Sequence, residues 1–479
     1  MKKIVLIFSL LFMFTVFSGY ALAGTETSSE TFWGYLAGNV NTGSYNTFIG
    51  RTAGYSNNQS DYNTFVGAYS GYVNTSSTVG EASYNTFLGY GTGRNNTTAS
   101  YNTFMGYNAG YYNTTGGNNT FIGAQAGDAN TSTTNNTFLG YRAGYANTAS
   151  FNTFVGSQAG EDNVGGTRNT FIGRAAGSNN IEGDYNTFVG YRAGFYNTAS
   201  ENAYLGYYAG YYNTTGTSNT FIGPYAGYGQ SGISTGSNNT FVGYQAGYVN
   251  TTGELNTFIG FKTGSKNTTG SRNAFLGYST GINNTTGAHN TFFGYAAGNK
   301  NTTGSFNTYL GNYSGLANTT GQRNTIIGYT AGQNNVGDGN VFIGYAAGAN
   351  EAGNNKLYID NSDTATPLIY GDFTTNSVII NGSFSYTSSR AYKDNINDLS
   401  GKEAMDALAG LKPVKYVFKA DPGEQQLGFI AEDVPDLVAS NDHKRVSAMD
   451  FVAVLTKVVQ EQQAIIEKLE QRLLAVEAK

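Results

Sequence analysis

The 479-residue sequence contains no cysteine, five prolines, one tryptophan and two histidines. Without cysteine there are no disulfide bonds, so stability must come from packing and assembly. His289 and His443 have no acidic partners at ligand spacing, so we expect no metal site, and no cofactor motif is present. Acidic residues before residue 354 are scattered singly, unlike the paired carboxylates of a glycosidase. The net charge of −5 gives no basic surface for nucleic acid.

Glycine and two aromatic residues are abundant instead. The chain has 66 Gly, 38 Tyr and 30 Phe. This glycine content is about twice the usual share, but it lacks the triplet period of collagen. Hydrophobic residues make up 39% of the sequence, which argues against disorder.

A short repeat fills most of the chain. A phrase close to Asn-Thr-Phe-Ile-Gly-Tyr-x-Ala-Gly recurs, mostly every 16 or 17 residues, after a degenerate copy that begins at Glu30. This period suits one coil of a β-solenoid, which would stack on its neighbours at about 4.8 Å. The repeats begin at Asn46, Asn63, Asn85, Asn102, Asn119, Asn136, Asn152, Asn169, Asn186, Asn202, Asn219, Asn239, Asn256, Asn273, Asn290, Asn307, Asn324 and Asn340.

Each coil is expected to contain two short strands and two turns. Neighbouring apolar residues such as Phe258 and Ile259 should face opposite sides of a strand, one inward and one outward. A whole column of outward apolar residues is a large exposed patch, so we expect other chains to cover it. The alternative is a local bulge that turns both residues inward. The stacked Asn residues should form ladders of amide hydrogen bonds.

The N-terminus is typical of an export signal. Lys2 and Lys3 precede an apolar stretch from residue 4 to 17, and Ala21-Leu22-Ala23 offers a cleavage site. An uncleaved membrane anchor is the alternative, but the apolar stretch is short for a span. We therefore expect a bacterial protein that is secreted or held at the cell surface, with no transmembrane span after signal cleavage.

The repeat resembles the head of trimeric autotransporter adhesins, whose coils carry Asn-Ser-Val-Ala-Ile-Gly-type phrases in a left-handed β-roll. The shared features are Asn at the coil start, the apolar-Gly step and the small-Gly pair that follows. The present coils are a few residues longer, and no membrane-anchor barrel follows them. The resemblance implies a trimeric, adhesive rod.

The composition changes after Thr387. Charged residues number 24 in residues 24–353 and 27 in the 92 residues 388–479. Residues 355–360, 367–373 and 377–382 indicate a short β-stalk before this change. Beyond it, residues 401–409 predict a short helix, 414–418 a strand, and residues from Asp450 onward a long helix.

The C-terminal segment resembles the intramolecular chaperone of phage tail spikes and endosialidases, serine peptidase family seventy-four. The matching phrases occupy residues 388–396, 411–416 and 428–434 and are followed by the terminal helix. The resemblance implies a Ser388–Lys393 dyad that makes a single cut between Thr387 and Ser388 and acts on no other substrate. A neutral Lys can accept the proton of a Ser nucleophile. The family pattern has Asp and Arg where this chain has Ser389 and Ala391.

The terminal helix has the spacing of a coiled coil. Its apolar positions alternate in steps of three and four, with one polar residue that would fix the register. The spacing is compatible with either a dimer or a trimer, and the family resemblance implies a trimer. The core positions are Val452, Leu455, Val459, Gln462, Ile466, Leu469, Leu473 and Val476.

Together these features predict a mainly β protein. Its parts are a signal peptide (1–23), a solenoid rod of about 17 residues per coil (24–353), a β-stalk (354–387), a small α+β chaperone domain (388–449) and a coiled-coil helix (450–479). The expected function is an adhesin-like homotrimeric fibre that binds a glycan or surface receptor. One alternative is a tail-fibre-like receptor- or carbohydrate-binding protein with an uncleaved cap. A minor alternative is an ice- or mineral-binding solenoid, which would need flat Thr-x-Thr rows.

Overall fold

The computed structural model describes residues 29–478 except 77, 386 and 420. The signal peptide expected at residues 1–23 lies outside the described residues. By its internal contacts the chain divides into two compact units, one ending at Pro367 and the other beginning at Leu368. Among the described residues, no helix has both the length and the apolar character needed to cross a membrane.

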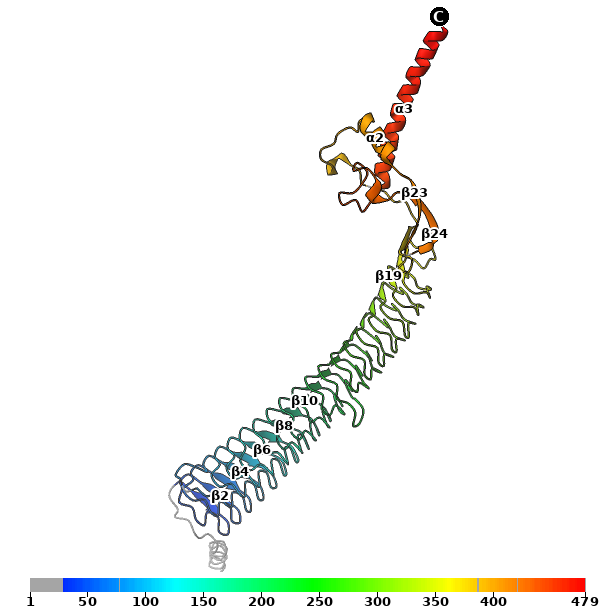
Figure 1. The fold of residues 1–479 in the computed structure, drawn as a ribbon. Helices are drawn as coiled ribbons and strands as arrows, with labels where there is room; N and C mark the ends of the chain where they lie inside the picture. Colours follow the sequence, from blue (N-terminus) through cyan, green and yellow to red (C-terminus); the bar gives the residue numbers. More distant parts are fainter. Residues whose placement is uncertain (1–28, 77, 386, 420, 479) are drawn as a thin grey trace, which may run out of the picture. The chain divides into compact units, whose positions relative to one another are not determined.

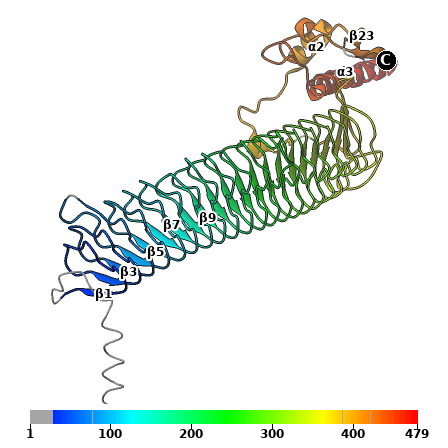
Figure 2. The same cartoon turned by 90° about the horizontal axis from the view of Figure 1, so that it is seen from below.

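The first unit is a β-solenoid, which confirms the fold class expected from the sequence (Figure 1). Its strands lie in a row along the rod (Figure 2). They pair in parallel with equivalent residues opposite each other, as Phe171 is to Phe188. They are β1 (Thr31–Trp33), β2 (Thr47–Ile49), β3 (Thr64–Val66), β4 (Thr86–Leu88), β5 (Thr103–Met105), β6 (Thr120–Ile122), β7 (Thr137–Leu139), β8 (Thr153–Val155), β9 (Thr170–Ile172), β10 (Thr187–Val189), β11 (Ala203–Leu205), β12 (Thr220–Ile222), β13 (Thr240–Val242), β14 (Thr257–Ile259), β15 (Ala274–Leu276), β16 (Thr291–Phe293), β17 (Thr308–Leu310), β18 (Thr325–Ile327), β19 (Val341–Ile343) and β20 (Lys356–Ile359).

Each described coil has one strand, so the expectation of two strands was wrong. The segment after the second Gly forms only isolated bridges, at Asn58–Thr75 and Asn213–Ser234. Its backbone N–H groups donate mainly to carbonyls of the adjoining coil, but successive groups share one carbonyl, as Thr268 and Thr269 share that of Thr285, so no regular ladder forms. At the other end of the repeat, β20 continues the parallel register of β19. The first strand of the segment expected as a stalk is therefore a further strand of the solenoid.

The middle residue of each strand fills the interior. Phe188 is fully buried, and its ring stacks between Phe171 and Tyr204 at centroid distances of 4.8 and 4.7 Å. Such stacking continues from coil to coil along the rod until Ile326 replaces the ring. Each buried aromatic ring contributes roughly 2–3 kcal/mol through the apolar area it removes from water. The small residue before the second Gly, such as Ala193, is also fully buried and completes this narrow core.

The third residue of each strand faces outward. This confirms the expectation that of two neighbouring apolar residues one faces inward and the other outward. Leu205 is 49% exposed and Ile259 is 36% exposed, although the preceding Tyr204 and Phe258 are buried. The alternative in which a bulge turns both residues inward is wrong. The first residue of each strand, usually Thr, lies on the same outward face. This face therefore carries a Thr column beside an aliphatic column rather than Thr-x-Thr rows.

Two glycines turn each coil. Gly190 has φ +138° and Gly194 has φ +60°, conformations that L side chains rarely adopt. A Cβ at Gly190 would collide with the carbonyl of Gly206 in the next coil, and one at Gly194 would collide with the ring of Phe188. The repeat keeps Gly at these positions because the coils stack this closely.

Two Asn ladders run through the interior of the rod, which confirms the ladders expected from the sequence. At the coil start, the Asn186 Oδ1 accepts a bond of 2.9 Å from the backbone N–H of Asn202. Nearer the second turn, the ladder joins amide to amide, as in the 2.8 Å bond from Asn284 Nδ2 to Asn267 Oδ1. Both kinds of bond recur along the rod, so each coil fixes the register of the next.

The second unit is smaller and mixes helices with hairpins. Helix α2 begins with a capping box between Ser400 and Glu403 and packs on α3. The helix expected at 401–409 and the strand expected at 414–418 are both present. The elements are β21 (Ile369–Asp372), β22 (Ser377–Ile380), η1 (Arg390–Tyr392), α2 (Gly401–Gly410), β23 (Val414–Phe418), β24 (Asp421–Gly428), η2 (Ala431–Asp433) and α3 (Ala448–Glu477).

Candidate self-processing and assembly site

Ser388 and Lys393 lie together at the start of the second unit. The Nζ of Lys393 donates a 2.7 Å hydrogen bond to the Oγ of Ser388. The short helix η1 brings the two residues together, because it reverses the chain between them. Its first turn is capped by the side chain of Ser389, which accepts from the N–H of Ala391. The two residues that depart from the family pattern thus form the turn that joins Ser388 to Lys393.

This contact has the geometry that a Ser–Lys nucleophile requires. The hydroxyl is within reach of an amine that can take its proton once the amine is neutral. A lysine becomes a base most readily when it is desolvated. In the single chain, Thr387, Ser388 and Lys393 are all exposed. The chain alone therefore supplies the contact but not the desolvation.

Helix α3 has one apolar side packed and another free. Val454 and Val458 are buried against Ala404 and Ala407 of α2. This second apolar side was not predicted from the sequence. The pattern that indicates it is the pair Val454 and Val458, which are four residues apart and lie between the heptad positions. The heptad positions lie elsewhere on the helix and are 46–70% exposed wherever they are apolar: Val452, Leu455, Val459, Ile466, Leu469, Leu473 and Val476.

The last four turns of α3 have no support within the described chain. From Gln462 to Ala478 every side chain is exposed. A helix of this length without tertiary packing is marginal in water. The exposed Leu and Ile side chains therefore form an apolar surface that is open to another chain.

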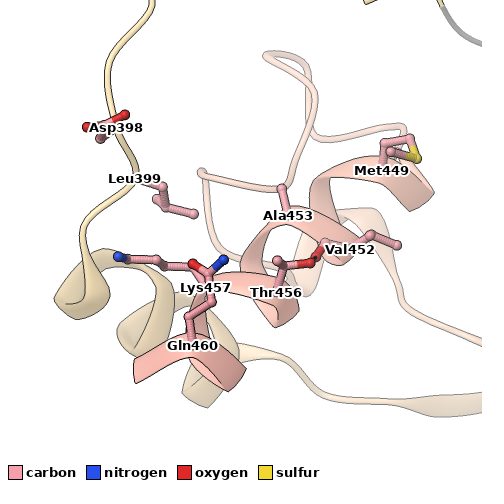
Figure 3. A pocket seen from close by; sticks show the side chains of 8 residues that line it. All are labelled: Asp398, Leu399, Met449, Val452, Ala453, Thr456, Lys457 and Gln460. Carbon is pink, nitrogen blue, oxygen red and sulfur yellow. Dashed lines mark hydrogen bonds between the residues drawn. The ribbon is translucent and has the colours of Figure 1, made fainter. Parts of the chain in front are cut away.

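An open hollow of about 530 Å³ lies beside the first turns of α3 (Figure 3). Asp398 and Leu399 form one wall, and α3 residues from Met449 to Gln460 form the other. It adjoins the free heptad positions Val452 and Leu455, so it belongs to the same uncovered side of the helix.

Ion pairs fasten the loop that precedes α3. Lys444 Nζ lies 2.7 Å from Glu432 Oε1 of η2. This hydrogen bond lowers the pKa of Glu432 and raises that of Lys444. The pKa of Asp442 is lowered mainly by a hydrogen bond from Ser440. All of these groups are exposed, so they position the loop more than they stabilise the unit.

A family model described as chaperone of endosialidase matches residues 388–442. Searches of the curated proteins and of the solved structures returned no match. The match begins at Ser388 and covers η1, α2, the β23–β24 hairpin and η2. The resemblance drawn from the sequence is therefore confirmed for this segment.

A chaperone-of-endosialidase domain behind a β-solenoid rod fits a trimeric fibre that carries its own intramolecular chaperone. The family suggests self-association, and the exposed heptad surface is available for it. Among the described residues, no group of three or more His, Asp or Glu side chains could hold a metal ion.

Proposed function

We propose that this chain forms an exported, adhesin-like homotrimeric fibre, and that its C-terminal module aligns three chains and then cuts itself off between Thr387 and Ser388. The observation that carries the proposal is the family match at 388–442 together with the free heptad side of α3. Three such helices would cover one another's apolar positions and hold the chain ends at one point.

The aliphatic column of the rod supports the same assembly. It runs from Trp33 to Ile343 on one outward face, and many of its members are more than a third exposed. Monomeric soluble proteins rarely expose apolar strips of this extent. Packing this face against two other copies would remove it from water. Registration of β-structure among three chains is slow, so an alignment device at one end is useful.

The exposure of the dyad supports an order in which assembly comes before cleavage. Lys393 needs a less hydrated setting to act as a base, and assembly of three modules would provide it. Cleavage would then follow trimer formation. Loss of the module afterwards would make the fibre kinetically hard to take apart.

The central experiment compares the full chain with Ser388→Ala on a denaturing gel and by light scattering. The wild-type chain is expected to yield a rod fragment and a fragment of residues 388–479, and Ser388→Ala is expected to stay whole but trimeric. Ser383→Ala, at an exposed serine outside the turn that joins the dyad, is the matched control and is expected to cleave. Lys393→Arg, which cannot act as a base, is expected to stay whole.

The outcomes separate the alternatives. A trimer that remains whole in the wild type would support the uncleaved cap and overturn self-cleavage. A monomeric wild type would overturn the fibre. Export is tested separately by sequencing the N-terminus of protein recovered outside the cell, which is expected to begin at Gly24.

A further inference from the structure

Part of the rod carries a dense group of tyrosines beside its first turn. We define the tyrosine platform as Tyr191, Tyr207, Tyr208, Tyr211, Tyr225 and Tyr228, from the coils of β10 to β12. They occupy the two positions after the first Gly of each coil and the position after the second Gly. Tyr207 is 45% exposed, whereas Tyr211 is 7% exposed and supports the rings around it.

The platform has a defined geometry. Rings stack along the rod, as Tyr211 does on Tyr228 at 5.4 Å. Rings of neighbouring columns meet edge to face, as in the pair Tyr207–Tyr208 at 4.5 Å and 84°. Burial and then the nearby Tyr196 raise the pKa of Tyr211 to about 12, so its hydroxyl stays protonated and able to donate.

The solenoid does not need tyrosine at these positions. Other coils place Ala68 or Ala124 where Tyr207 stands, and Gln125 or Ser279 where Tyr208 stands. Their left-handed backbone is the same, with φ near +55° at Tyr208 and at Ser279. The aromatic cluster is therefore an addition to the fold rather than a part of its core.

A cation without a carboxylate partner lies within the platform. The Arg192 guanidinium lies 5.5 Å from the ring centre of Tyr191 and 3.5 Å from the hydroxyl of Tyr208. No ion pair involves it among the described residues. In the coils from residue 35 to 346, the two positions after the first Gly hold no Asp or Glu, but they do hold Arg51, Arg142, Arg174, Arg192 and Lys262.

We infer that the tyrosine platform binds a carboxylated polysaccharide, one built from uronic acid residues. This inference rests on the proposed adhesive function and names its ligand class. The flat C–H faces of sugar rings stack on exposed aromatic rings, and phenol hydroxyls exchange hydrogen bonds with sugar hydroxyls. The Arg192 guanidinium pairs with a carboxylate through two parallel N–H bonds, which a neutral sugar cannot match. The two columns after the first Gly hold no acidic residue, and Asp128 and Glu161 in the column after the second Gly belong to coils outside the platform, which favours an anionic polymer over a neutral one.

The test measures binding of the purified full-length chain to polygalacturonate, with dextran as the neutral polymer, by calorimetry. Arg192→Gln is expected to weaken polygalacturonate binding about tenfold, since it removes a charge-assisted pair. Gln fits this backbone because Gln245 occupies the same position with the same φ. Tyr207→Ala is expected to weaken binding as well. Tyr278→Ala, an exposed tyrosine of the same column outside the platform, is expected to bind as the wild type does.

The inference is overturned if the wild type does not bind polygalacturonate, if dextran binds equally well, or if Arg192→Gln binds unchanged. Light scattering on the same samples distinguishes the two proposals. A trimer that does not bind polygalacturonate would refute only the proposed ligand. A monomer that binds it, with weaker binding in the variants as expected, would refute only the proposed trimeric fibre.

Discussion

The rod and the C-terminal unit differ in how they bury and hydrogen-bond their side chains. In the rod, a fully buried Phe188 stacks between equivalents in the coils on either side, and the Asn that begins a coil accepts a bond from the next coil, as Asn186 does from Asn202. The C-terminal unit has a core of six buried side chains: Ala404, Ala407, Val434, Val438, Val454 and Val458. Its longest element, α3, leaves its heptad side in water.

This difference indicates where each unit obtains its stability. The rod repeats one contact many times along a single chain, so its interior is complete without a partner. The C-terminal unit cannot bury enough apolar surface alone, which is usual for so small a core. In the proposed trimer, contacts between copies would therefore be concentrated in α3 and in the outward column of the rod.

The largest expected effect comes from a charge on the free side of α3. Ile466→Asp would place a carboxylate in the core of the helix assembly, where burial of an unpaired charge is prohibitive. We expect complete loss of the trimer by light scattering. Gln471→Asp adds the same charge at an exposed position outside the heptad core and should leave the trimer intact. A trimeric Ile466→Asp protein would show that α3 is not the assembly surface.

The next effect compares the two columns of one strand. Phe188→Ala removes a ring buried within its own chain and should destabilise the rod by about 3–5 kcal/mol. Val189→Ala, on the outward face, should cost under about 1 kcal/mol in a single chain and more where another chain covers it. Chemical denaturation followed by circular dichroism measures both. Equal costs in a monomeric sample would contradict the assignment of inward and outward columns.

Sequence patterns predicted the rod better than the C-terminal site. The alternation of Phe258 and Ile259 follows from strand geometry alone, so their inward and outward directions were predictable. The single strand per coil was not predictable, because successive N–H groups of the second segment converge on one carbonyl of the adjoining coil, as Thr268 and Thr269 do on Thr285, instead of forming a regular ladder. At the dyad, the sequence indicated Ser388 and Lys393 by resemblance. The turn at Ser389 that brings them together was not predicted from the sequence and is seen only in the structure.

A smaller effect comes from pH, at a charge within the rod. Burial raises the pKa of Asp128 from 3.8 to about 6, although Arg142 opposes the shift. Between pH 4 and 6 the folded state binds more protons than the unfolded state, so stability falls as pH rises through this window. The penalty above pH 6 is on the order of 2 kcal/mol.

Asp128→Asn is the test of this pH dependence. It should raise the melting temperature at pH 7.5 and have little effect at pH 4, as measured by thermal denaturation. Asp162→Asn, at an exposed position one residue further along the equivalent turn two coils away, is the control and should leave the pH profile unchanged. A profile that is the same in Asp128→Asn and the wild type would refute the assignment.

The smallest effect separates two tyrosines that replace Phe in the interior stack. The hydroxyl of Tyr204 accepts a 2.6 Å bond from Asn213 Nδ2, so Tyr204→Phe should cost about 1 kcal/mol. The hydroxyl of Tyr309 has no hydrogen-bond partner among the described residues, so Tyr309→Phe should be neutral or stabilising, since it removes a buried unsatisfied group. Both rings lie in the same column with 0–1% exposure, so packing is matched and only the hydrogen bond differs. Denaturation midpoints that fall equally in both variants would mean that the Tyr309 hydroxyl is also satisfied, through a water or a partner chain. The interior of the rod would then share the dependence on its surroundings that the C-terminal unit shows.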